Sequence, residues 1–168
     1  MSRKADKVSL DLVNNGIGPM IENAVRLYHD ALLLYENNRY PTACSVAILA
    51  VEELGKILCY MDVAKANPDN EREQKKALMG HNKKLTILEM LEQFSLPNGE
   101  IQKAYVELKN IAKNNSVNDL KQWGLYVDLD NNNWLTPSNR VKKIHAKCLL
   151  TCAGHLLVFF NSMPISVS

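Results

Sequence analysis

The feature that most constrains the fold is an apolar stretch at residues 39–60, RYPTACSVAILAVEELGKILCY. Pro41 favours a helix start there, because its fixed φ suits a helix and a first turn does not need its N–H group. At about 100° per residue, apolar side chains cover most of the helix circumference and leave a narrow polar strip at Ser45, Glu52 and Lys56. A helix that is apolar almost all round usually lies at the centre of a bundle, so this stretch predicts an all-α core built around it.

The composition is typical of a soluble chain with one main domain. The chain has 168 residues, of which 46% are hydrophobic and 23% charged, and this is enough to bury a real core. A net charge of +2 argues against binding of nucleic acid by bulk charge. No apolar run reaches the length of a membrane span and the first residues lack the apolar core of a signal peptide, so we expect a cytoplasmic protein with no membrane partner.

The hydrophobic periodicity divides the chain into a lead-in, one helical domain and a tail. Residues 1–16 are the polar lead-in, residues 17–163 the helical domain and residues 164–168 the tail. Gly18-Pro19 is expected to begin the first helix of the domain. The connection from this helix to the apolar stretch is very short, which predicts an antiparallel helical hairpin.

A long loop is expected before the last helix. Residues 114–139 have no helical period. Within the run GLYVDLDNNNW the first residues alternate as in a short strand and three asparagines then favour a turn, which predicts a loop with at most a small hairpin. The expected fold is therefore all-α, an antiparallel bundle of four to five helices with a long loop before the last one. Beyond the first two helices, the others are expected at about 69–93, 99–113 and 138–161.

The start of the last helix carries the strongest candidate for chemistry, an Arg-x4-His pair formed by Arg140 and His145. Imidazole transfers protons near neutral pH, and a guanidinium group holds a phosphate and its developing charge, so the pair suits cleavage of a phosphodiester bond. Lys142, Lys143 and Lys147 make the first turns basic and are candidate RNA contacts. In a continuous helix five residues rotate by about 140°, so the pair would converge only around a substrate or with residues of a second chain. The plainer alternative is a chance spacing.

A second candidate lies on the apolar helix itself. Glu52 and Lys56 are expected to form a surface pair one turn apart. Glu53 projects at the edge of the core and is expected to have a partner such as His81 or a nearby lysine. The preferred interpretation is a buried polar anchor, and the alternative is the acid–base group of a hydrolase built on Glu53 and His81.

Two other groups have the residue types of metal sites, but neither has the geometry. His145, Cys148, Cys152 and His155 form a stripe on the last helix that spans about 15 Å, too long for one ion, so we expect core packing and no metal. The four cysteines of the chain fit reduced, buried thiols.

The oxygen-rich loop that begins at Asp128 lacks the glycine and distal glutamate of a calcium loop, so we interpret it as turn chemistry. Tyr126, together with Trp123 and Trp134, could line a surface that binds a base or a partner, or could simply cover the loop.

Several short runs, in the right order, resemble the AbiV-type HEPN family, whose best known members are bacterial abortive-infection proteins that act against phage. The most specific are EELGK at 52–56 and LYVD at 125–128. The others are Asn23-Ala24, Asp30-Ala31, Tyr40-Pro41, His81-Asn-Lys83 and KQWG at 121–124.

The resemblance implies a HEPN-like bundle that forms a homodimer. It also implies a metal-independent endoribonuclease, without a cofactor, that cuts RNA to arrest translation. The family's Arg-x4–6-His motif corresponds to Arg140 and His145, with the active site where two chains meet. His145 would be the general acid/base and Arg140 would bind the phosphate. Glu53, Lys56, His81, Tyr126 and Asp128 would support that site, and a phage-encoded protein is a candidate activator.

The sequence departs from the family pattern in one place. Active members commonly have a polar residue directly after the arginine, where this chain has Val141, while Asn139 precedes the arginine. The departure favours an alternative function, a non-catalytic HEPN module that binds or senses a phage protein or a nucleotide.

Overall fold

The computed structural model describes residues 10–65, 87–88, 99–112 and 117–162. Most of the helix expected at 69–93, including His81, lies outside the described residues. The all-α prediction is confirmed, since the described part consists of helices and one two-stranded sheet. Its elements are α1 (Leu10–Glu36), α2 (Tyr40–Lys65), α6 (Gly99–Ala112), α7 (Val117–Trp123), β1 (Asp128–Asp130), β2 (Asn133–Leu135), α8 (Pro137–Arg140) and α9 (Lys143–Ser162).

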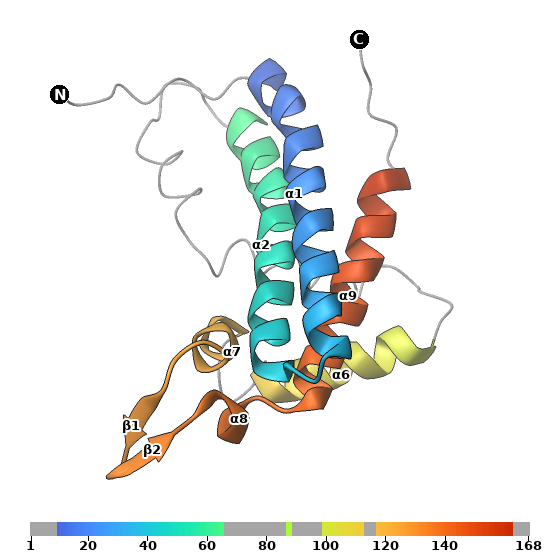
Figure 1. Ribbon diagram of the computed structural model, residues 1–168. Coiled ribbons are helices and arrows are strands. Elements are labelled where there is room, and N and C mark those ends of the chain that lie inside the picture. The colour runs from blue at the N-terminus through green and yellow to red at the C-terminus, as the bar shows by residue number, and fades with distance from the viewer. Residues whose placement is uncertain (1–9, 66–86, 89–98, 113–116, 163–168) are drawn as a thin grey trace, which may run out of the picture.

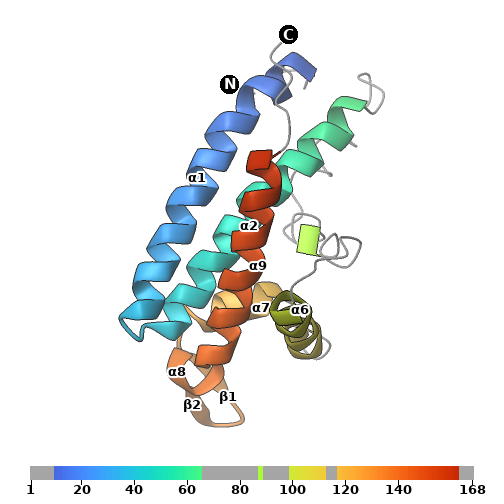
Figure 2. The same ribbon diagram turned by 90° about the vertical axis from the view of Figure 1, so that its right-hand side faces the viewer.

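Three long helices form the body of the protein. Helices α1 and α2 run side by side as an antiparallel pair, and α9 packs along both of them (Figure 1). Helix α6 crosses near the first turns of α9, and Figure 2 shows it almost end-on beside that helix. The short elements α7, β1, β2 and α8 gather at the end of the bundle where α2 and α9 begin. The sequence therefore brings the first turns of α2 and α9 to the same end as the loop.

Helix α2 is the central helix, as the apolar stretch predicts. Its side chains Ala47, Ile48, Val51 and Leu54 are completely buried. Small residues such as Ala43 and Ala47 leave room for the neighbouring helices, and Leu and Ile fill the space between them. The four cysteines are free and buried, so the prediction of buried thiols is confirmed.

The predicted start of the first helix is wrong. Helix α1 begins at Leu10 and contains Pro19 in its interior. Val13 is only 3% exposed, so the core-facing stripe of the helix continues upstream of the proline. The burial of that stripe outweighs the backbone hydrogen bond that the proline removes.

The last helix is broken in two, whereas the sequence predicts one helix at 138–161. Helix α8 ends at Arg140, Val141 takes extended backbone angles (φ −106°, ψ 118°), and α9 begins at Lys143. Val141 is only 2% exposed. The chain leaves helical geometry at Val141 while it buries this side chain in the core, so the Arg-x4-His motif spans a break between two helices.

The loop before the last helix contains more structure than expected. A small hairpin is confirmed, with Asn131 and Asn132 in its two-residue turn at φ 46° and φ 64°, angles that asparagine tolerates better than most residues. Helix α7, by contrast, falls where no helix is predicted. Seven residues make only two turns, too few for a periodic pattern to be recognised.

Helix α9 is long and apolar enough, by length and composition alone, to cross a membrane. Half of its most apolar window is buried inside the protein. The prediction that no stretch reaches the length of a membrane span is therefore wrong by these criteria. The core helix of a soluble protein also meets them, and α9 packs along α1 and α2.

Candidate functional site

Arg140, the last residue of α8, is held on two sides. Its Nη1 atom donates a hydrogen bond to Oδ2 of Asp128 over 3.1 Å, and its guanidinium carbon lies 5.1 Å from the centre of the Trp123 ring. The Arg140 side chain is 15% exposed and that of Asp128 is 64% exposed. A planar cation between an aromatic face and a carboxylate has a restricted orientation, so the guanidinium is presented at the surface in a defined position.

The hairpin explains why Asp128 faces Arg140. Side chains alternate along a strand, and the register pairs Leu129 with Trp134, which places these two on the face opposite to Asp128. Leu129 is 55% exposed and Trp134 is 70% exposed, so that face points to solvent. The hairpin therefore turns its acidic face toward α8 and its apolar face outward.

Helix α7, which carries Trp123, is fixed to α2 by a buried ion pair. Nζ of Lys121 lies 2.6 Å from Oε1 of Glu52, and each side chain is 7% exposed. The sequence predicts a surface pair between Glu52 and Lys56, and this prediction is wrong. Lys56 instead pairs with Glu53 over 2.5 Å at the edge of α2. Lys121 is a residue that the sequence interpretation did not single out, although it lies in the KQWG run at 121–124.

Two further contacts bring α7 against the first turns of α2. The Ser45 hydroxyl donates a hydrogen bond to the carbonyl oxygen of Lys121 over 2.8 Å. Gly124 follows α7 and lies so close to α2 that an added Cβ would be 2.1 Å from the Ser45 hydroxyl and 2.4 Å from the Pro41 carbonyl oxygen. Only glycine fits at this contact, so the KQWG run packs directly against the first turns of α2.

His145, the third residue of α9, has a structural role in a single chain. Its Nδ1 atom accepts a hydrogen bond from the backbone N–H of Lys142 over 3.2 Å. Lys142 directly precedes α9, so the imidazole caps this helix in the way that a glutamine or glutamate at the third position commonly does. Burial, followed by the nearby charge of Lys142, lowers the pKa of His145. The ring is therefore neutral at pH 7, with its proton on Nε2 while Nδ1 accepts.

The three basic residues of the motif point in different directions. Lys142 donates through Nζ to the carbonyl oxygen of Ser138 over 2.8 Å. Lys143 places its Nζ 5.7 Å from the Tyr35 ring centre and 5.6 Å from the Tyr40 ring centre. Lys147 lies further along the outer side of α9. Of these lysines, Lys142 is the one next to Arg140 and His145 in the broken segment.

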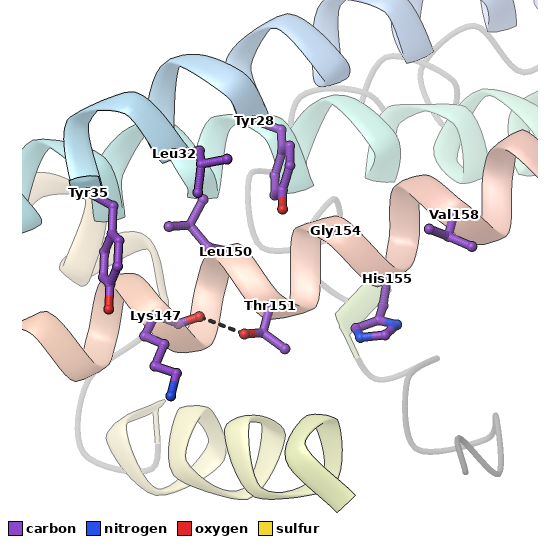
Figure 3. A pocket seen from close by; sticks show the side chains of 9 residues that line it. All are labelled: Tyr28, Leu32, Tyr35, Lys147, Leu150, Thr151, Gly154, His155 and Val158. Atoms are coloured by element: carbon purple, nitrogen blue, oxygen red, sulfur yellow. Dashed lines mark hydrogen bonds between the residues drawn. The ribbon is translucent and has the colours of Figure 1, made fainter. Parts of the chain in front are cut away.

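The outer side of α9 forms a groove with α1. The groove has a volume of about 460 Å³. Figure 3 shows Tyr28 and Tyr35 extending from α1 toward α9, with Lys147 and His155 on the α9 side. His145 and Lys147 are two residues apart, about 200° on a helix, so the groove and His145 lie on opposite sides of α9. The groove is therefore a separate surface from the Arg140 and His145 site.

The prediction that the cysteine and histidine stripe of α9 packs in the core holds for the cysteines only, because His145 and His155 are half-buried and His155 lines the groove. Cys148 and Cys152 are buried, and the Cys148 thiol donates a hydrogen bond to Glu107 over 3.2 Å. Burial raises the pKa of both thiols to about 12. Among the residues that the structure describes, no group of three His, Cys, Asp or Glu side chains could hold a metal ion.

The other predicted supporting residues divide into two sets. Asp128 contacts Arg140 directly, whereas Glu53 and Lys56 pair with each other on α2. Tyr126 is 61% exposed and lies between α7 and the hairpin. The geometry thus brings a guanidinium together with a carboxylate and an aromatic ring, and the neutral imidazole of His145 follows five residues later, beyond the helix break. A guanidinium binds a phosphodiester, and an imidazole donates to or exchanges a proton with its oxygens.

A sequence model of the AbiV family (HEPN_AbiV) matches residues 12–158 of the 168-residue chain. The match includes α2, α7, the hairpin and both helices of the Arg-x4-His motif. Comparisons with curated proteins and with solved structures found no match.

Proposed function

The chain belongs to the AbiV family of abortive-infection HEPN proteins, and we propose that it is a metal-independent endoribonuclease that cuts RNA in the cytoplasm to arrest translation. The observation that carries the proposal is the position of Arg140. Its guanidinium is oriented by Trp123 and Asp128 at the exposed end of α8, directly before the helix that His145 caps. Such a guanidinium can exchange its carboxylate partner for a phosphate of RNA.

The proposed reaction uses the ribose 2′-OH as nucleophile. The 2′ oxygen attacks the adjacent phosphorus, the bond from phosphorus to the 5′ oxygen breaks, and the product has a 2′,3′-cyclic phosphate end. Arg140 stabilises the charge that develops on the phosphate oxygens. His145 exchanges the protons: one leaves the 2′-OH and one arrives on the departing 5′ oxygen.

The hydrogen bond by which His145 caps α9 limits how this side chain can transfer protons. While Nδ1 of His145 accepts the Lys142 N–H, Nε2 carries the proton and can only donate. Acceptance of a proton by Nε2 requires the Lys142 contact to open. The lowered pKa of His145 keeps the imidazole in the neutral form that a base needs near pH 7.

A homodimer completes the proposal. A dimer through the groove between α1 and α9 would leave Arg140 and His145 outside its interface, in contrast to the shared active site that the family resemblance implies. The groove between α1 and α9 is the surface that we propose for the second chain, because it is lined largely by apolar and aromatic residues and includes Val158, which is 68% exposed. Val158→Asp is expected to produce monomers in analytical ultracentrifugation. Leu33→Asp is the matched control, because Leu33 is 61% exposed on α1 but does not line the groove.

The test of the activity is cleavage of RNA in the presence of a chelator. Wild-type protein is expected to give discrete fragments, alone or with a phage-encoded protein as activator. Arg140→Ala is expected to lower kcat/KM by about 100-fold or more. His145→Gln keeps the cap of α9, because glutamine accepts at the third helical position, but cannot exchange a proton. Full activity of His145→Gln would overturn the assignment of His145.

The second candidate is a non-catalytic HEPN module that binds a phage protein or a nucleotide. The observation in its favour is that Arg140 and His145 each have a structural partner within one chain. Val141, the unusual neighbour of Arg140, is buried in the core. Absence of cleavage by wild-type protein, with and without phage lysate, would leave this candidate as the better account.

A further inference from the structure

The buried ion pair between Glu52 and Lys121 is far from ordinary for a protein of this size, because charged side chains are rarely buried unless a specific arrangement requires them. Both side chains are 7% exposed. Apolar residues of similar volume would fill the same space without the cost of removing two charges from water. A gain in stability is therefore a weak explanation for the presence of this ion pair.

The pair is the start of a continuous chain of contacts that ends at Arg140. Glu52 on α2 holds Lys121 on α7, and two residues further along α7 the Trp123 ring lies under the Arg140 guanidinium. The segment that follows α7 leads to Asp128, which binds the same guanidinium from the hairpin. The orientation of Arg140 thus depends on where α7 is fixed against α2.

The other contacts between α7 and α2 are of a different kind. The Ser45 hydroxyl bonds to a backbone carbonyl, and Gly124 provides close packing, so both hold α7 near α2. An ion pair between two side chains additionally fixes the rotation of α7 about its own axis, and this rotation decides where Trp123 points.

We propose that the Glu52–Lys121 pair is a positioning element of the Arg140 site: it fixes the rotation of α7 and thereby the Trp123 ring and the guanidinium above it. Neither residue contacts the substrate. The inference rests on the proposed ribonuclease function for its kinetic consequence, while its structural consequence can be measured without any activity.

The structural test uses tryptophan fluorescence. The chain has two tryptophans, so in a Trp134→Phe background all tryptophan emission comes from Trp123. The double variant Glu52→Gln with Lys121→Met removes both charges of the pair and keeps the side-chain volumes. We expect acrylamide to quench Trp123 more strongly in this variant than in the background protein. The matched control is Glu53→Gln with Lys56→Met, which removes the neighbouring ion pair of α2 and should leave quenching unchanged.

The kinetic test separates positioning from a general loss of stability. In the wild-type background, the double variant is expected to raise KM for RNA about tenfold. This corresponds to a loss of about 1.4 kcal/mol in apparent binding free energy. In an Arg140→Ala background it should cause no further loss, because the group that it positions is gone. A merely structural role would lower activity by the same factor in both backgrounds.

The two proposals fail in different ways. If wild-type protein does not cleave RNA but the double variant changes Trp123 quenching, the ribonuclease function is wrong and the positioning of Trp123 stands. If quenching equals that of the background protein, or if the loss of activity is the same with and without Arg140, the positioning role is wrong.

Discussion

Replacement of Gly124 by alanine tests the close contact between the KQWG run and the first turns of α2. The added Cβ would lie 2.1 Å from the Ser45 hydroxyl oxygen and 2.4 Å from the Pro41 carbonyl oxygen, both far inside van der Waals contact. Ser45 can rotate away, but it then loses its hydrogen bond to the Lys121 carbonyl. The Pro41 carbonyl belongs to the backbone of α2, so it can move only if one of the two helices shifts.

The size of the effect follows from these two contacts. Loss of the Ser45 hydrogen bond costs about 1 kcal/mol. The shift of α7 away from the Pro41 carbonyl costs about 1–3 kcal/mol, the range for overpacking of a close-packed interior. Alanine gives the unfolded chain less conformational entropy than glycine does, and this stabilises the folded protein by about 0.4–1 kcal/mol. We therefore expect Gly124→Ala to lower the free energy of unfolding by about 1–4 kcal/mol and Tm by about 2–15 °C.

Urea denaturation followed by circular dichroism measures this change, and Gly18→Ala is the matched control. Gly18 lies inside α1 with no heavy atom within 4 Å of an added Cβ. Alanine there should raise the free energy of unfolding by roughly 0.5–1 kcal/mol, because it is the better helix former. A Gly124→Ala protein within about 0.5 kcal/mol of wild type, a typical surface effect, would refute the close contact between α7 and α2.

Three further predictions concern charge, pH and thiols. Glu52→Gln should lower the free energy of unfolding by about 3–5 kcal/mol because it leaves a buried lysine unpaired, whereas Glu53→Gln should cost at most about 1 kcal/mol in the same urea titration. Since the fold lowers the pKa values of His145 and His155, their contribution to stability should be lost as the pH falls below about 6.5, where the unfolded chain binds protons first. His145→Gln should reduce this dependence and leave the part due to His155, and an unchanged profile would contradict the lowered pKa of His145. The Cys44 and Cys152 thiols, with pKa values of about 12, should resist iodoacetamide at pH 8 until the protein unfolds, and rapid labelling of native protein would contradict their burial.

The bundle could be predicted because its signals are local and long. Twenty-two residues with apolar side chains almost all round, at 39–60, leave few solutions other than a central helix. The helical periodicity placed Glu52 in the polar strip and Glu53 at the edge of the core, and this assignment is wrong, because Glu52 is the glutamate that is buried. The choice is made by Lys121, which is 69 residues away in sequence and whose approach depends on the packing of α7.

The site was predicted by residue type and not by geometry. The motif identified Arg140 and His145 as candidates. Their relative rotation of about 140° was predicted for a continuous helix. The burial of Val141 breaks that helix, and a single valine among polar residues gives no signal of this. The Trp123 and Asp128 contacts to Arg140 join a helix and a strand that are remote from α8 in sequence, so no local pattern contains them.

The proposed function is cleavage of RNA by Arg140 and His145 without a metal ion. The most direct measurement is the chemistry of the RNA ends produced in chelator by wild type and by His145→Gln, two proteins that should be equally folded. The account predicts 2′,3′-cyclic phosphate ends from wild type and a loss of about 100-fold or more in the rate for His145→Gln. Equal rates for the two proteins, or product ends that appear only when a divalent metal is added, would contradict it.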